Sequence, residues 1–240
     1  MKRAEEKINL ATKPSIREAL GAYLLVIIFL AVLTRLAFIP FIKDNMGGFA
    51  IIPFVYMPIL LLRRKHEDLA DYGISWKDTG HNIAIGLLVS LAVFPLFWAG
   101  YHVYAMWICN SHFSFRLPDD FWLKLVGNLL VVALPEEFFF RGYMQTITDR
   151  KWPKGIRILG GRIGKSALFV SIAFAALHLA TDMQIFRLGV FFPSLVFCWL
   201  RSRTGSIIPG IVFHGLSNVF MNTLEASYQI AGLCIPFLTN

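Results

Sequence analysis

The stretch FWLKLVGNLLVVALPEEFFFRGYMQTI, residues 121–147, places two adjacent carboxylates and an arginine inside a long apolar run. Runs of about this length are needed to cross the hydrocarbon core of a bilayer. Charged side chains are costly at that depth, and those that occur there usually serve a function. The stretch therefore predicts a membrane span that contains a polar site, with Glu136, Glu137 and Arg141 as its first candidate residues.

The composition of the whole chain agrees with a membrane protein. Of its 240 residues, 56% are hydrophobic and only 16% are charged, whereas soluble domains have about 45–50% apolar and about 25% charged residues. Isolated strands cannot satisfy their backbone polar groups in lipid, so the spans should be helices. The sequence thus predicts an all-α, polytopic helical bundle that forms one membrane-embedded domain over residues 1–240.

Eight membrane spans are expected from the hydrophobic runs. They lie at about 19–41, 48–62, 81–108, 121–148, 166–181, 184–200, 206–223 and 226–239. The second and the eighth are short for a full crossing. Residues 1–18 precede the first span and are interpreted as an interfacial segment rather than a cleaved signal peptide, because no small-residue cleavage site follows the apolar stretch.

The basic residues predict the orientation of the bundle. With the N-terminus inside, 17 of the 23 Lys and Arg residues fall in inner segments, whereas the outer loops hold only Lys43 and Arg116. An excess of Lys and Arg marks cytoplasmic loops, so both termini are predicted to be cytoplasmic. The same distribution accounts for the net charge of +8. Without a nucleic-acid-binding motif, it does not indicate a nucleic acid partner.

Polar residues on three different spans are expected at similar depths. Glu136, His178 and Asn218 each lie 12 or 13 residues from the inner end of their span, which corresponds to ~18–20 Å in a helix. His214 lies on the same helix face as Asn218, because the two are four residues apart. This agreement in depth predicts one buried site.

Spacing along residues 121–148 separates the two glutamates. Glu137 and Arg141 are four residues apart, with the acid first, which is the better orientation for an ion pair. Glu136 is rotated about 100° from Glu137 and can face a cavity. Each feature also has a structural alternative: a buried ion pair that holds helices together, a hydrogen-bonded core histidine at His178, and interhelical hydrogen bonding at His214 and Asn218.

The residue types favour hydrolysis by activated water. The chain has neither an H-E-x-x-H motif nor a G-x-S-x-G motif, and no cysteine lies beside a histidine in the sequence. Glu136, with His178 beside it, would act as general base on a water, and His214 and Asn218 would donate to the developing oxyanion. No cofactor is expected; a zinc site formed by Glu136, His178 and His214 is the alternative.

Three motifs carry a resemblance to a known family. EEFFFRG matches E-E-x-x-x-R, FAALH matches F-x-x-x-H, and RTGSIIPGIVFHGLSN ends in H-x-x-x-N. Together they resemble the CPBP family of intramembrane glutamic proteases, which includes the CAAX-processing Rce-type endopeptidases and the bacterial Abi-type proteins. The resemblance implies an eight-helix protease with its catalytic helices at 121–223 and a cavity open to the cytoplasm.

The resemblance also assigns roles and a setting. It makes Glu136, His178, His214 and Asn218 catalytic, with Glu137 and Arg141 in support. The family does not fix the substrate; we expect an integral protein of the bacterial plasma membrane that cleaves a membrane-anchored or lipidated protein or peptide near its C-terminal tail. Two alternatives stay open: a proton-coupled transporter, which would more naturally show internal repeats, and a catalytically inactive binding or immunity scaffold of the same fold.

Overall fold

The structure is a computed structural model that describes residues 14–230 and is mostly helical. Its α-helices are α2 (Ile16–Arg35), α3 (Pro40–Asp44), α4 (Met46–Ile51), α5 (Met57–Arg64), α6 (Thr79–Trp107), α7 (Phe121–Gly127), α8 (Leu134–Glu137), α9 (Gln145–Lys151), α10 (Lys165–Asp182), α11 (Phe191–Thr204) and α12 (Ile208–Tyr228). Wider π-helical turns are η1 (Ile52–Tyr56), η3 (Asn128–Ala133) and η4 (Phe138–Met144), and 3-10 turns are η2 (Leu69–Tyr72) and η5 (Ile185–Val190). The strands are β1 (Gly155–Ile158) and β2 (Gly161–Gly164).

Five helices among the described residues are long and apolar enough to cross a membrane. They are Ile16–Arg35, Met46–Arg64, Thr79–Trp107, Lys165–Asp182 and Ile185–Thr204, and they correspond to the first, second, third, fifth and sixth predicted spans. This supports an integral multi-pass membrane protein. The fourth and seventh predicted spans are helical as well, as the run Phe121–Lys151 and as α12, but are not among the five.

The two ends of the predicted topology lie largely outside the described residues. The eighth predicted span, 226–239, overlaps the end of α12, which continues to Tyr228. The predicted interfacial segment 1–18 overlaps the start of α2. There Ser15 and Glu18 form a reciprocal capping box, which fixes the first turn of the helix.

The helical run Phe121–Lys151 departs from the regular α-helix expected from the sequence. The π-helical turn η3 leads directly into α8, and Pro135 is the second residue of α8. Proline has no N–H and its ring crowds the preceding turn, so the helix must widen or kink there. Met46–Arg64 repeats this arrangement, since η1 directly precedes α5 and Pro58 is the second residue of α5. Wide turns of this kind often occur at functional sites.

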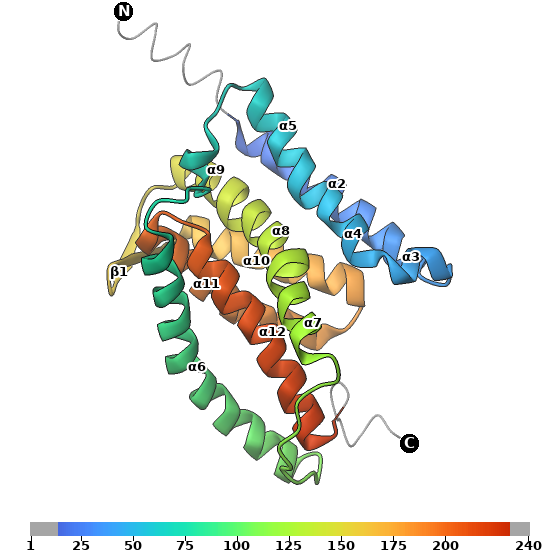
Figure 1. The fold of residues 1–240 in the computed structure, drawn as a ribbon. Coiled ribbons are helices and arrows are strands. Elements are labelled where there is room, and N and C mark those ends of the chain that lie inside the picture. The colour runs from blue at the N-terminus through green and yellow to red at the C-terminus, as the bar shows by residue number, and fades with distance from the viewer. Residues whose placement is uncertain (1–13, 231–240) are drawn as a thin grey trace, which may run out of the picture.

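The buried core surrounds the second half of the Phe121–Lys151 run. Every residue of η4 is buried, and Phe139, Phe140, Tyr143 and Met144 pack against α2, α10 and α11 in one hydrophobic cluster. Figure 1 shows α12 crossing the middle of the bundle, with α6 along one side and the α2 and α4–α5 pair on the other. The segment 151–165, between the fourth and fifth predicted spans, forms an antiparallel hairpin of β1 and β2.

Candidate active site

One cavity collects the four residues predicted to be catalytic. It has a volume of about 450 Å³ and is lined by Glu136, His178, His214 and Asn218, among others. Glu136 comes from α8, His178 from α10, and the other two from α12. Residues separated by up to 82 positions in the sequence therefore share one space, as the agreement in predicted depth indicated.

Glu137 and Arg141 lie behind the cavity wall and have no exposed surface. Arg141 Nη1 donates to Glu137 Oε1 at 3.0 Å, so the predicted ion pair is present. Arg141 Nη2 also donates to Ser194 Oγ at 2.6 Å, and the guanidinium carbon lies 4.4 Å from the centre of the Phe174 ring. The buried charge is thus neutralised, hydrogen-bonded and covered by an aromatic ring, which is what burial of a charge requires.

His214 connects the buried ion pair to the cavity. Its Nδ1 lies 3.0 Å from Glu137 Oε1, and its Nε2 lies 3.9 Å from Glu136 Oε2. The ring stacks on Phe197, with centroids 4.8 Å apart. With a proton on Nδ1 donated to Glu137, a neutral ring presents its Nε2 lone pair to the cavity, whereas an imidazolium presents a second N–H there.

His178 is held by its own helix. Its Nδ1 lies 2.9 Å from the carbonyl oxygen of Phe174, one turn earlier. That carbonyl can only accept, so the Nδ1 proton is directed at it and the neutral ring keeps Nε2 as an acceptor. The Phe174 ring lies 4.5 Å from the His178 ring. The first and last residues of the FAALH motif therefore position each other.

Glu136 is set apart from its neighbour by its exposure to the cavity. Within the described part of the chain, Glu136 Oε2 is buried and has no hydrogen-bond partner, although its side chain keeps 14% of its surface exposed toward the cavity. Asn218 is partly buried and lies one helical turn after His214. A carboxylate without a partner beside two histidines and an amide is an arrangement suited to binding and deprotonating a water.

The far end of the cavity is charged. Asp182, Arg187 and Glu225 line it there, and Arg187 Nε pairs with Asp182 Oδ2 at 2.7 Å. A second cavity of about 690 Å³ shares Asn222 and Glu225 with the first. This charged end lies where α10 and α12 finish, opposite the basic loops. If the basic loops are cytoplasmic, the charged end faces the other side of the membrane, in contrast to the cytoplasmic opening implied by the family resemblance.

Three residues that support the site were not singled out from the sequence. Ser194 binds Arg141 from α11, and Phe197 stacks under His214. Gly210 lets α12 approach the buried carboxylate, because a Cβ atom there would lie 2.7 Å from Glu137 Oε2. Only Gly210 had a signal in the sequence, as part of the third motif; Ser194 and Phe197 lie in an ordinary apolar run.

A metal site is a separate question. Among residues 14–230, no group of three or more His, Cys, Asp or Glu side chains is arranged to hold a metal ion. The predicted zinc alternative, with Glu136, His178 and His214 as ligands, thus has no such cluster behind it.

The chain matches one family model, described as type II CAAX prenyl endopeptidase Rce1-like, over residues 118–220. This confirms the resemblance that the three motifs indicated, and the matched segment contains all six residues singled out from the sequence. No curated protein and no solved structure gives a significant match to the chain.

Proposed function

We propose that this chain, with its Rce1-like segment at residues 118–220, is an intramembrane endopeptidase that uses a glutamate-activated water. The substrate would be a membrane-anchored or lipidated protein or peptide, cut near its C-terminal tail. The observation that carries the proposal is the convergence of Glu136, His178, His214 and Asn218 on one cavity. The description of the family as an endopeptidase supports the same reaction class.

In the proposed mechanism, Glu136 is the general base. Its carboxylate, which lines the cavity, accepts a proton from a water held between Glu136 and His178 Nε2. The resulting hydroxide attacks the carbonyl carbon of the scissile peptide bond. Glu136 then returns the proton to the leaving nitrogen as the C–N bond breaks, which leaves a new carboxyl group and a new amine.

His214 and Asn218 would stabilise the oxyanion that forms on the attacked carbonyl. Asn218 has an N–H₂ group that can donate directly. His214 can donate from Nε2 only as an imidazolium, because its Nδ1 proton is directed at Glu137. Glu137 would therefore orient His214, and Arg141 would hold Glu137 in place through the ion pair. Donors fixed in this way before the reaction are the main source of oxyanion stabilisation.

Cleavage of a defined substrate tests the proposal. The purified protein in vesicles would be incubated with a library of membrane-anchored peptides, with and without lipidation, and the products identified by mass spectrometry. We expect peptide cleavage that is lost in Glu136→Gln, which keeps the shape of the side chain and removes the base. Glu18→Gln is the matched control, since it makes the same change on α2, outside this cavity.

The same assay separates the alternatives. Cleavage that survives a metal chelator would agree with the predicted absence of a cofactor, whereas loss restored by zinc would support the zinc alternative. A transporter would instead cleave no peptide in the library and would move a solute into the vesicles together with protons. That result would overturn the protease proposal.

A further inference from the structure

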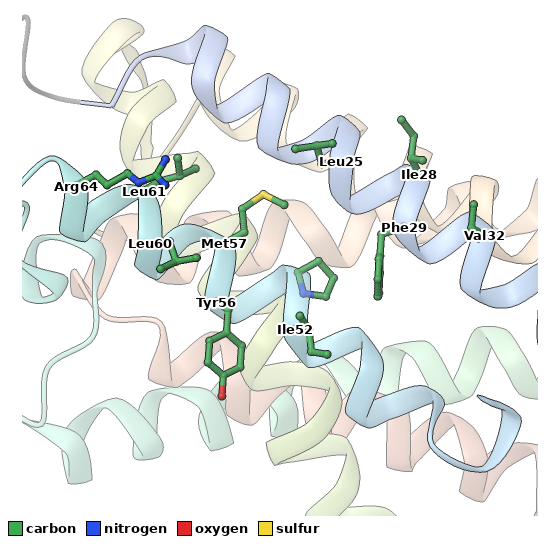
Figure 2. A pocket seen from close by; sticks show the side chains of 11 residues that line it. Leu25, Ile28, Phe29, Val32, Ile52, Tyr56, Met57, Leu60, Leu61 and Arg64 are labelled. Atoms are coloured by element: carbon green, nitrogen blue, oxygen red, sulfur yellow. The ribbon is translucent and has the colours of Figure 1, made fainter. Parts of the chain in front are cut away.

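Another large concave surface lies on the outside of the bundle, between α2 and the continuous helical run of α4, η1 and α5. Figure 2 shows side chains from both runs lining it, including Leu25, Phe29, Tyr56 and Leu60. Its volume is about 710 Å³. Its lining is apolar except for the Tyr56 hydroxyl and for Arg64, which lies at one end of the groove.

The groove faces the surroundings of the bundle rather than its core. Leu25 and Leu60 are both more than half exposed. The opposite face of the same helices forms part of the wall of the candidate active site, where Leu30 and Phe54 line the cavity. The groove is thus separate from the proposed catalytic residues and needs an occupant of its own.

We propose that this groove binds one anionic phospholipid, with an acyl chain between α2 and α5 and the phosphate group at Arg64. Ile52 and Arg64, which both line the groove, are twelve residues apart, or ~18 Å along a helix. Half of the ~30 Å hydrocarbon core, the depth of one leaflet, is ~15 Å. The groove is therefore long enough to hold an acyl chain that spans one leaflet.

The charge at the end of the groove selects the headgroup. Arg63, Arg64 and Lys65 are consecutive, and Lys65 pairs with Glu18 at 3.1 Å. Arg64 has no ion-pair partner among the described residues, so its charge is available to a phosphate. Basic residues at the cytoplasmic end of a span attract anionic lipids, and this end is predicted to be cytoplasmic.

The apolar lining argues against a polypeptide in the groove. A peptide strand in lipid must satisfy every backbone N–H and C=O group, and this surface offers almost no polar atoms to do so. A hydrocarbon chain makes no such demand. A helix from a second copy of the chain satisfies its own backbone, and is the competing occupant that the experiment must separate.

Lipid-dependent stability of the delipidated protein tests the proposal. Its melting temperature would be measured in a neutral detergent with increasing dioleoyl phosphatidylglycerol or dioleoyl phosphatidylcholine, which share acyl chains and differ in headgroup charge. A ligand of the folded state raises the melting temperature with its concentration. We expect the anionic lipid to act at lower concentration. Arg64→Gln should weaken its apparent affinity about fivefold, the equivalent of ~1 kcal/mol for one basic residue.

Two matched pairs make the result specific. Arg63→Gln removes the adjacent exposed charge, which does not line the groove, and should keep most of the selectivity. Leu25→Trp should fill the groove and weaken binding of both lipids. Leu24→Trp, at a similarly exposed position outside the groove, should not.

Several outcomes would overturn the proposal. Equal effects of the two lipids, or equal losses in Arg63→Gln and Arg64→Gln, would mean that only diffuse surface charge is involved. Equal behaviour of the two tryptophan variants would mean that the groove is not occupied by lipid. A dimer in light scattering that Leu25→Trp dissociates, with no response to lipid, would assign the groove to a second copy of the chain.

Discussion

Adjacent glutamates in this chain occupy two different environments. Glu137 is completely buried, with Arg141 and His214 both 3.0 Å from its Oε1. Glu136 faces the cavity, and its Oε2 has no hydrogen-bond partner among the described residues. A buried carboxylate held by two partners at 3.0 Å is suited to positioning, whereas one that lines a cavity can exchange protons with a bound water. The two residues should therefore fail in different ways when changed.

Glu137→Gln should mainly lower stability. The amide keeps the shape but removes the charge opposite Arg141, and leaving one member of a buried pair uncompensated costs roughly 3–5 kcal/mol. We expect a lower melting temperature in detergent, with some cleavage activity remaining. Glu136→Gln, measured in parallel, should melt near the wild-type temperature and be inactive. A stable, inactive Glu137→Gln beside an active Glu136→Gln would reverse the two assignments.

His214→Ala and Asn218→Ala should lower turnover more than substrate binding. A donor aimed at an oxyanion acts in the transition state, and loss of one costs about 10²–10³ in kcat at characterised sites. The check is kcat and KM of both variants on a cleaved peptide. His214→Ala should also lose stability, because Glu137 loses a partner, whereas Asn218→Ala should not. Unchanged kcat with a raised KM in both variants would contradict the oxyanion role.

From the sequence, contacts between residues could be predicted only within one helix. Four-residue spacing was enough to predict the pairing of Glu137 with Arg141, because both lie on one continuous helical run. It could not predict that His214 would bind Glu137, since that contact joins residues 77 positions apart. Ser194 was missed for the same reason, as its bond to Arg141 depends on how α11 packs.

At the scale of elements, proline determines where the fourth predicted span departs from a regular helix. The sequence predicted helix over residues 121–148, and the structure has helix there. One wide turn, η3, precedes α8 and another, η4, follows it. Pro135 gives a physical reason for the first turn. No proline follows in η4, so the second turn depends on packing that a single sequence does not reveal.

Gly210 sets how closely α12 approaches α8. An alanine Cβ at this position would lie 2.7 Å from Glu137 Oε2, and that carboxylate is held by Arg141 and His214. Gly210→Ala should therefore push α12 outward, destabilise the protein by ~1–3 kcal/mol as overpacking does, and reduce cleavage. The melting temperature and the cleavage activity of Gly210→Ala, each compared with the wild type, measure these two effects.

Gly100→Ala in α6 is the matched control, because no atom lies within 4 Å of an added Cβ there. Removal of a helical glycine should stabilise the protein by about 0.5–1 kcal/mol. Equal effects of the two substitutions would show that the contact between α12 and Glu137 is not tight.

For the whole molecule, the hydrophobic runs predicted the existence of the spans better than the residues at which the spans end. Five expected spans reappear as helices long and apolar enough to cross a membrane. The segment between the fourth and fifth spans forms a hairpin, since Leu159 and Gly160 both adopt positive φ and allow a tight turn. Trp199 Nε1 then donates to the Ile158 carbonyl at 2.7 Å and attaches the hairpin to α11. Such long-range docking is not encoded in hydropathy.

The orientation of the molecule remains a prediction, and the structure supplies positions that test it. Ile156 in the basic hairpin and Phe115 at the opposite end are both at least 70% exposed. In a cysteine-free background, Phe115→Cys should react with a membrane-impermeant reagent added to intact cells, and Ile156→Cys only after lysis. Reporter fusions at residues 2 and 240 should both report the cytoplasm.

The labelling result also decides which side of the membrane the charged end of the cavity faces. Residues 114–116 bind Ser227 at the end of α12, two residues from Glu225. If Phe115→Cys reacts from outside, Glu225 and the charged end of the cavity lie on that face. The opposite pattern would invert the bundle and place the charged end on the cytoplasmic side, where the family resemblance implies an opening. Termini on opposite sides would instead remove one of the eight spans, and the short second or eighth would be the first to reconsider.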